Sequence, residues 1–190
     1  MIGVVMAGGQ ATRLNRRVEK ALLEVGWRTL LGRASDALSA DGIDEIVVAV
    51  THWTPKTKAV AEGLKLRTVE TSGSGYHEDT LELLKEFGNY VSLNVDVPFI
   101  DTQHVERLVR HVRSESLAAV VPASMALKDP DDESLGVDDQ GNAIVWVGLN
   151  YVTSQPKTGF LVYQDPLLTL NINTEDDLSL VRAIAAQRNG

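Results

Sequence analysis

The sequence of 190 residues contains no cysteine. This absence excludes disulfides, thiolate metal ligands and a cysteine nucleophile. No apolar run approaches the ~18 residues needed to span a membrane, and Met1 leads directly into an apolar segment without a basic leader. We therefore expect a protein without a membrane partner that works in the cytoplasm.

Clusters of lysine and arginine are also missing, and the formal net charge is −8. A polyanion would be repelled by this charge, so nucleic acid is not an expected partner. Hydrophobic residues make up 44% and charged residues 23%, which is an ordinary globular mixture, and no linker or internal repeat is visible. We predict a single domain over residues 1–190; its oligomeric state is left open.

The strongest motif lies in the first twenty residues, where the apolar run 2–6 ends in Ala7-Gly8-Gly9-Gln10-Ala11-Thr12-Arg13. Two adjacent glycines let the backbone approach a ligand closely and turn its N–H groups toward phosphate. Arg13 would add a planar fork and Lys20 a compact charge. This predicts a triphosphate site, in which a carboxylate placed at Gly8 would project toward the phosphates. An ordinary strand-to-loop turn with solvated charges is the alternative.

Other phosphate-binding motifs are absent. The sequence has no G-x-x-x-x-G-K-[ST], no G-x-G-x-x-G after the first strand, and no Asn-Lys-x-Asp run for guanine. A nucleotide that binds here must be held by a different architecture.

Strand and helix patterns alternate along the chain. Continuous β-branched runs are typical of strands buried on both faces of a parallel sheet, and the segments between them have helical spacing. Strands are predicted at 2–6, 46–50, 66–70, 90–94 and 118–121, with an edge strand at 168–172. Helices are predicted to begin near residues 29, 55, 76, 102 and 175. We predict an α/β fold with a doubly wound, mostly parallel sheet.

A second glycine-rich turn, Thr71-Ser72-Gly73-Ser74-Gly75-Tyr76, again joins a strand to a helix. The helix behind it starts with Glu78 and Asp79. These acids either suit the positive end of the helix or recognise a base or ribose.

Asp96 follows the strand 90–94 and precedes the stiff turn at Pro98. Open α/β sheets place ligand chemistry at this end of their strands, and Mg²⁺ prefers one or two carboxylates together with phosphate oxygens and water. Asp96 is therefore a candidate metal ligand, and an Asx turn before the next helix is the alternative. The four histidines are expected to have structural or surface roles.

The pattern changes between about residues 128 and 151, where a solvated acidic loop precedes a predicted β-hairpin around Gly141-Asn142. Such a small β-hairpin insertion typically forms a lid or an acceptor-binding face. Gly148 indicates close approach of a ligand or of neighbouring backbone. Thr174 and Asp177 are predicted to cap the C-terminal helix.

Three motifs together carry a resemblance: Met6-Ala7-Gly8-Gly9-x-x-Thr12-Arg13 with Glu19-Lys20, Asp96-x-Pro98-Phe99-Ile100, and 171–178. They resemble the nucleotidyltransferase superfamily that includes the molybdenum-cofactor guanylyltransferases. Segments 54–58, 71–76 and 148–150 are most similar to its archaeal cobinamide-phosphate guanylyltransferase branch. The likeness spans nearly the whole chain.

The resemblance implies a Rossmann-like sheet of the nucleotide-diphospho-sugar transferase type, with GTP over its strand ends and a phosphate-bearing corrinoid as acceptor in cobalamin biosynthesis. Lys20, Arg13 and Asp96 would be catalytic, and Mg²⁺ would bind Asp96 and Asn173. The implied nucleotide-binding residues are Ala7, Gly8, Gly9, Thr12, Arg13, Lys20, Thr71, Gly73 and Gly75. Gly148, Asn171 and Asn173 would line the site.

The sequence departs from the family pattern at Ala11, Asn15 and Ala21, where glycine, glycine and proline are common. If position 11 requires a positive φ, alanine there costs roughly 1–2 kcal/mol.

The implied chemistry is consistent with the residues present. A phosphate monoester with a second pKa of ~6 can attack the α-phosphorus without a protein base, so no Ser-His-Asp set is required. Bound GTP without turnover, as in a regulatory domain, and transfer to molybdenum cofactor remain the alternatives. Trp146, Leu149 and Tyr151 either offer apolar surface to a corrin ring or belong to the core.

Overall fold

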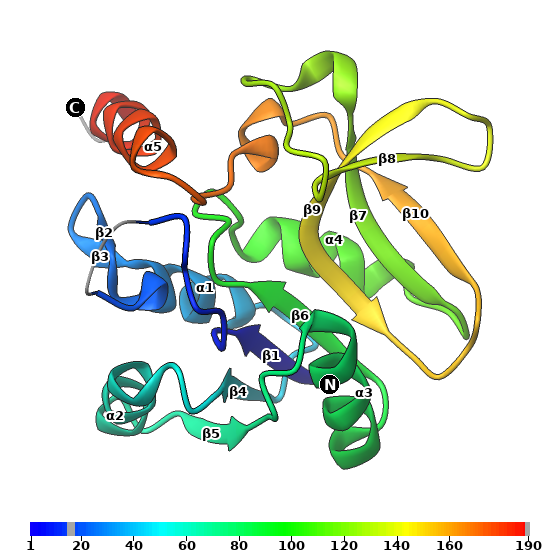
Figure 1. Cartoon of the computed structure of the whole chain (residues 1–190). Helices are drawn as coiled ribbons and strands as arrows, with labels where there is room; N and C mark the ends of the chain where they lie inside the picture. Colours follow the sequence, from blue (N-terminus) through cyan, green and yellow to red (C-terminus); the bar gives the residue numbers. More distant parts are fainter. Residues whose placement is uncertain (15–17, 189–190) are drawn as a thin grey trace.

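The computed structural model describes residues 1–14 and 18–188 and has a central mixed sheet flanked by helices (Figure 1). One half of the sheet is parallel, in the order β5-β4-β1-β6. Its strands are β1 (Ile2–Met6), β4 (Glu45–Val50), β5 (Arg67–Glu70) and β6 (Tyr90–Asn94). The predicted α/β class and mostly parallel sheet are confirmed.

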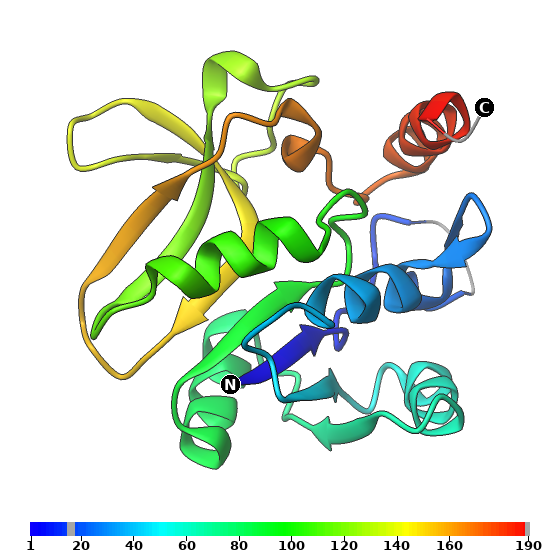
Figure 2. The same cartoon turned by 180° about the vertical axis from the view of Figure 1, so that it is seen from behind.

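Helices cover both faces of this half. They are α1 (Leu30–Leu38), α2 (Pro55–Gly63), α3 (Tyr76–Phe87) and α4 (Thr102–His111). The helices α1 and α4 lie side by side on one face, seen in front in Figure 2, and share the main apolar core. The helix α3 packs on the opposite face, where Leu83 meets Val4 and Val47. Both faces of β1, β4 and β6 are therefore largely buried, as their continuous apolar runs predict, whereas the edge strand β5 is partly exposed.

The other half of the sheet contains the predicted hairpin. Its strands are β7 (Ser116–Pro122), β8 (Leu135–Val137), β9 (Ala143–Val152) and β10 (Thr158–Val162). The long strand β9 runs antiparallel between β6 and β7, and β8 pairs with its first residues. The predicted small insertion therefore contributes an interior strand of the sheet.

The predicted edge strand at 168–172 is wrong. Pro166 starts the 3₁₀ turn η3 (Pro166–Thr169), with Asp165 accepting a hydrogen bond from the Leu167 N–H at its start. The edge is formed by β10, which pairs in parallel with β7. The alternating apolar residues Leu168, Leu170 and Ile172 are nevertheless buried, because the loop lies against the core.

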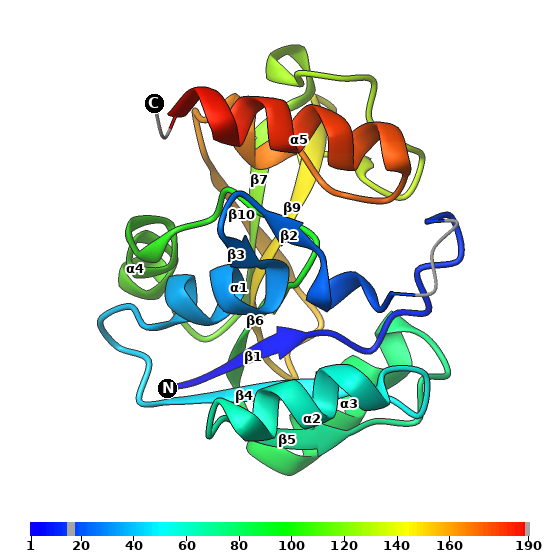
Figure 3. The same cartoon turned by 90° about the vertical axis from the view of Figure 1, so that its left-hand side faces the viewer.

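The C-terminal helix α5 (Glu175–Arg188) begins with the predicted cap: the Asp177 N–H donates to Thr174 Oγ1 and the Thr174 N–H to Asp177 Oδ2, at 3.2 and 2.8 Å. It lies beside β2 (Glu24–Val25), where Arg182 Nε donates to the Glu24 carbonyl at 2.9 Å (Figure 3). The remaining short elements are β3 (Arg28–Thr29), η1 (Lys20–Leu22) and η2 (Ala123–Met125). In the described ranges, no helix combines the length and apolar character needed to cross a membrane.

Candidate active site

The two glycine-rich loops and Asp96 come together at the carboxyl ends of β1, β5 and β6, and line a pocket of about 320 Å³, here called the loop pocket. This is the edge at which open α/β sheets bind ligands. The pocket is lined by Met6, Ala7, Gly8, Gly9, Gln10, Lys20, Trp53, Gly73, Gly75, Tyr76, Asp79, Asn94, Val95 and Asp96. Three of the residues expected to bind nucleotide, Thr12, Arg13 and Thr71, are not in its lining.

Gly8 packs directly on Thr51, at the end of β4. The Thr51 hydroxyl donates to the Gly8 carbonyl at 2.8 Å, and a Cβ on residue 8 would lie 2.5 Å from Thr51 Cγ2. The expectation that a side chain at Gly8 would project toward phosphate is therefore wrong, because it would meet Thr51. A Cβ on Gly9 would meet no heavy atom within 4 Å. Gly8 is required by packing beneath the loop, whereas Gly9 faces open space.

The backbone at Ala11 has the positive φ that the family glycine would favour, at 52°. This left-handed conformation is strained for alanine. Ala21 is buried in η1, and Asn15 lies outside the described residues.

Lys20 joins two of the predicted motifs. Its Nζ donates to Asp96 Oδ2 and Asn173 Oδ1, each at 2.9 Å. The side chains of Lys20 and Asp96 are only 15% and 21% exposed, so this ion pair is largely removed from water. Its backbone is held by Glu19, whose carboxylate accepts the N–H groups of residues 56 and 57 and thereby caps α2. Lys20, Asp96 and Asn173 therefore form one contiguous cluster.

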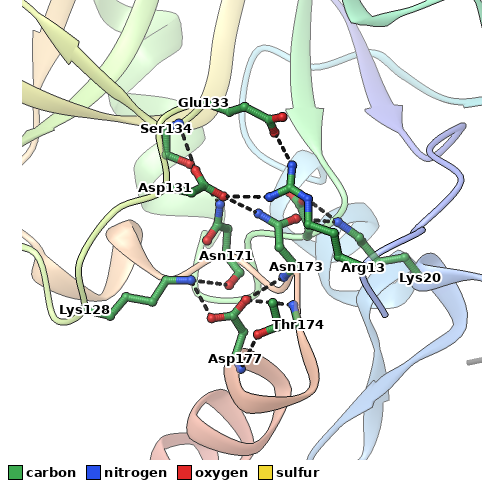
Figure 4. Close-up of polar contacts among 11 residues, drawn as sticks. Arg13, Lys20, Lys128, Asp131, Glu133, Ser134, Asn171, Asn173, Thr174 and Asp177 are labelled. Atoms are coloured by element: carbon green, nitrogen blue, oxygen red, sulfur yellow. Dashed lines mark hydrogen bonds and ion pairs between the residues drawn. The ribbon is translucent and has the colours of Figure 1, made fainter. Parts of the chain in front are cut away.

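Arg13 points to the acidic loop of the insertion (Figure 4). Its guanidinium donates to Glu133 at 2.7 Å and to Asp131 at 3.4 Å. Asp131 also accepts from Asn173 Nδ2 and the Ser134 N–H, each at 3.0 Å. Burial raises the pKa of Asp131, but the hydrogen bonds from Ser134 and Asn173 and the charge of Arg13 outweigh it, so the pKa lies below its usual value. The expectation of a solvated acidic loop is therefore wrong for Asp131, whose side chain is 29% exposed, whereas Glu133 remains 76% exposed while it pairs with Arg13.

Lys128 fastens the start of the insertion to α5. Its Nζ donates to Asp177 Oδ1 at 2.6 Å and to the Asn171 carbonyl at 3.4 Å (Figure 4). The backbone N–H of Ile172 in turn donates to the Asp96 carbonyl at 3.0 Å. The loop that carries Asn171 and Asn173 is thus fixed both to the insertion and to the end of β6.

A second pocket of about 510 Å³, here called the hairpin pocket, adjoins the loop pocket. Its lining includes the predicted residues Gly148, Asn171 and Asn173, together with Glu133, Ser134, Trp146 and Asn150. The two pockets share Tyr76, Asn94 and Asp96. The arrangement can therefore hold two ligands that meet beside Asp96.

Asn94 occupies the junction and was not singled out from the sequence. A Cβ on Gly148, whose φ is 81°, would lie 2.9 Å from Asn94 Nδ2, so packing against Asn94 requires this glycine. Asn94 Oδ1 is buried and finds no hydrogen-bond partner within the described chain. A buried acceptor without a partner is costly, and Asn94 is a residue that lines both pockets.

Asp79 does more than favour the start of α3. Its Oδ1 accepts the Gly73 N–H at 3.0 Å, which fixes the second glycine turn, and the residue also lines the loop pocket. Thr71 is turned away from the pocket, since its hydroxyl donates to the Val50 carbonyl at 3.4 Å. Of the aromatic candidates, Leu149 and Tyr151 are buried, whereas Trp146 is 37% exposed.

Comparisons with known proteins agree with this geometry. Adenosylcobinamide-phosphate guanylyltransferase of Methanocaldococcus jannaschii is 27% identical over 194 residues, covering 97% of each chain. The bifunctional protein GlmU of Corynebacterium aurimucosum is 32% identical over 138 residues, which are 67% of this chain but only 28% of GlmU. The structure of CMP:2-keto-3-deoxy-manno-octonic acid synthetase complexed with CTP has the same fold, with a TM-score of 0.67, 98% coverage of both chains and 15% identity.

The family model for the MobA-like NTP transferase domain matches residues 3–130, a span that contains both glycine loops, Lys20 and Asp96. The chain therefore belongs to the MobA-like NTP transferase family and is a nucleotidyltransferase.

Proposed function

We propose that this nucleotidyltransferase moves GMP from GTP to adenosylcobinamide phosphate and releases pyrophosphate, a step of cobalamin biosynthesis. The observation that carries the proposal is the meeting of two pockets at Asp96, because a group transfer needs both substrates within reach of one point. The identity of the acceptor is supported by the M. jannaschii relative, which matches along 97% of both chains.

In the proposed reaction, an oxygen of the acceptor phosphate attacks the α-phosphorus of GTP. A new P–O bond forms as the bond from the α-phosphorus to the bridging oxygen of the β-phosphate breaks, and pyrophosphate departs. The attacking phosphate is already largely dianionic at neutral pH, so no protein base is needed. The chain has to align the two anions and neutralise their charge.

The loop pocket supplies the groups for the donor. The backbone from Ala7 to Gly9 would approach the phosphates, and the turn of Gly73 and Gly75 would hold the nucleoside. Lys20 would stabilise charge that grows on the transferring phosphoryl group. Arg13 would reach the triphosphate by exchanging its exposed partner Glu133 for phosphate oxygens.

The charges of the site favour a divalent cation. The ionised side chains of the cluster are the cations Arg13, Lys20 and Lys128 and the carboxylates Asp96, Asp131, Glu133 and Asp177. The carboxylates outnumber the cations, and both substrates add negative charge, so attraction between side chains and substrates alone is insufficient.

Asp96 and Asn173 carry oxygens of the kind that Mg²⁺ prefers. Asp96 Oδ2 and Asn173 Oδ1 each accept from Lys20 Nζ at 2.9 Å, so both oxygens face the Lys20 ammonium, and Mg²⁺ would bind them if that ammonium turned to the phosphates. The part of the chain that the structure describes has no cluster of three His, Cys, Asp or Glu side chains for a metal. One carboxylate with an amide oxygen suits Mg²⁺, which takes its other ligands from phosphate and water. When bound, Mg²⁺ would stabilise charge on the phosphoryl oxygens.

The proposal is tested by incubating the protein with GTP, Mg²⁺ and adenosylcobinamide phosphate and measuring pyrophosphate and the corrinoid product. We expect pyrophosphate release that stops with excess EDTA and is weaker with ATP, CTP or UTP. Transfer to molybdenum cofactor but not to the corrinoid would overturn the acceptor assignment. Tight GTP binding without pyrophosphate in the presence of either acceptor would indicate a regulatory GTP-binding role instead.

A further inference from the structure

A third hollow, of about 530 Å³, adjoins the hairpin pocket and is here called the α3 groove. The hairpin pocket and the α3 groove share Tyr76, Trp146 and Asn150. One wall of the groove is α3, and the other is formed by β7, β9 and β10. This is the face of the sheet opposite α4, as the views from the two sides show (Figures 1 and 2). The groove is therefore continuous with the proposed site of transfer.

The groove has an unusual lining for an acidic protein. Charged residues make up 23% of the chain, yet no Asp, Glu, Lys or Arg is found among the described residues that line the groove. Its two walls present apolar side chains to solvent, with Tyr76 and Leu81 from α3 50% and 42% exposed. Hydroxyl and amide side chains lie among them, including Asn150 and Gln155. An apolar surface with neutral hydrogen-bonding groups suits a large, mostly apolar ligand that carries amides.

Trp146 lies between the hairpin pocket and the groove, and its neighbours hold the indole in place. Its ring centroid lies 5.5 Å from that of Phe160 on β10. On β8, a Cβ on Gly136 would lie only 2.6 Å from Trp146 Nε1, so a glycine is needed to admit the indole. A side chain held in this way offers apolar surface without a large loss of conformational entropy on binding.

We propose that the α3 groove binds the corrin ring of the acceptor while the acceptor phosphate lies in the hairpin pocket beside Asp96. The assignment rests on the proposed transfer to a corrinoid phosphate. The corrin macrocycle is flat and apolar with carboxamide arms at its periphery, which matches the apolar walls and the neutral polar groups of the groove. The shared residues Tyr76, Trp146 and Asn150 would lie along the link between ring and phosphate.

The test uses one matched pair of variants in the full chain. Leu81→Glu places a charge in the groove, whereas Leu64→Glu makes the same change at an exposed leucine, 53% accessible, at the end of α2. Leu64 lines none of the three hollows. Both leucines are exposed, so both variants should fold, which thermal unfolding checks.

With saturating GTP, Leu81→Glu should raise the KM for adenosylcobinamide phosphate about tenfold or more, because the ring must desolvate the new charge. The KM for GTP should not change, and Leu64→Glu should behave as the parent. Binding of cobinamide, which lacks the phosphate, is measured in parallel by equilibrium dialysis in the presence of GTP and Mg²⁺. We expect the parent to bind cobinamide and Leu81→Glu to bind it at least tenfold more weakly.

The two assays separate the two proposals. If the parent binds cobinamide and Leu81→Glu does not, but no pyrophosphate is released with the phosphorylated acceptor, the groove assignment stands and the transfer proposal fails. If transfer occurs and Leu81→Glu leaves the acceptor KM and cobinamide binding unchanged, the groove assignment is overturned. The groove assignment would also be overturned if the parent were a dimer and Leu81→Glu dissociated it without changing cobinamide binding. That result would identify the groove as a contact between two copies of the chain.

Discussion

The contact between Gly8 and Thr51 yields a prediction that separates packing beneath the glycine loop from contact with phosphate. A Cβ on residue 8 would lie 2.5 Å from Thr51 Cγ2, whereas carbon atoms normally approach to about 3.5–4.0 Å. Residue 8 does not have a positive φ, so alanine there adds no backbone strain of its own. Gly8→Ala should therefore push the loop outward by about 1 Å, at an overpacking cost of about 1–3 kcal/mol.

Thr51→Ser should relieve this clash. Serine keeps the hydroxyl that donates to the Gly8 carbonyl but lacks Cγ2, and the next nearest atoms to the added Cβ lie 3.6 Å away, an ordinary contact. Removing one buried methyl should by itself cost about 1 kcal/mol. The double variant should then be no less stable than Thr51→Ser alone, which corresponds to a coupling of about 1–3 kcal/mol.

The assays are urea unfolding for stability, calorimetric titration for GTP affinity and pyrophosphate release for activity. Gly9→Ala is the control for stability alone, because its Cβ would meet no protein atom within 4 Å while Gly9 itself lines the loop pocket. A displacement of about 1 Å in the loop should weaken activity on the order of a hundredfold in Gly8→Ala, and the second substitution should restore most of it. Additive losses of stability in the double variant, or a loss of stability in Gly9→Ala equal to that in Gly8→Ala, would refute the packing explanation.

Three further predictions follow from the site and the core. Asp96→Asn and Lys20→Ala should each lower kcat by about 10²–10³ with little change in GTP affinity, because both groups act on charge that develops during transfer; parental kcat in either variant would contradict its role. Ala11→Gly should stabilise the protein by about 1 kcal/mol, since φ is 52° there, and an unchanged urea midpoint would argue against strain. Burial raises the pKa of Tyr163 to about 12, so the free energy of unfolding should fall between pH 10 and 12, where only the unfolded tyrosine ionises. Tyr163→Phe should reduce this fall by at most about 3 kcal/mol, measured by urea unfolding at several pH values, and an identical fall would contradict the assignment.

The parallel half of the fold could be predicted because its pattern is local. Continuous apolar runs such as 46–50 mark buried strands, and the helix predicted to begin near residue 102 corresponds to α4, which begins at Thr102. The position of β9 could not be predicted, since its apolar pattern does not say which strands it pairs with. The segment 168–172 alternates as a strand does, but its Ile172 N–H donates to the Asp96 carbonyl rather than to a neighbouring strand.

The candidate site likewise has residues that could be predicted from the sequence and contacts that could not. Lys20 and Asp96 could be singled out because glycine loops and strand ends have recognisable chemistry, and Asn173 was implied by the family resemblance. The structure brings the three into contact. The pairing of Arg13 with Glu133 joins residues 120 positions apart and depends on how the insertion folds back. The role of Gly8 could not be predicted, because it depends on the pairing of β1 with β4, which places Gly8 against Thr51, 43 positions away in the sequence.

The division of the chain between the two pockets bears on how specificity is set. Residues that line only the loop pocket all precede Asp96, whereas those that line only the hairpin pocket all follow it. If the pockets hold donor and acceptor as proposed, changes at residues that line only the hairpin pocket should act mainly on the acceptor, except at Glu133 and Asn173, which contact Arg13 and Lys20. Tyr76, Asn94 and Asp96 line both pockets and are placed to contact both substrates. Asn94 is the most constrained of the three, because Gly148 packs against its side chain while its buried Oδ1 still needs a donor or a cation. Because the two pockets meet beside Asp96 and Asn94, a shift of either side chain would change both pockets together.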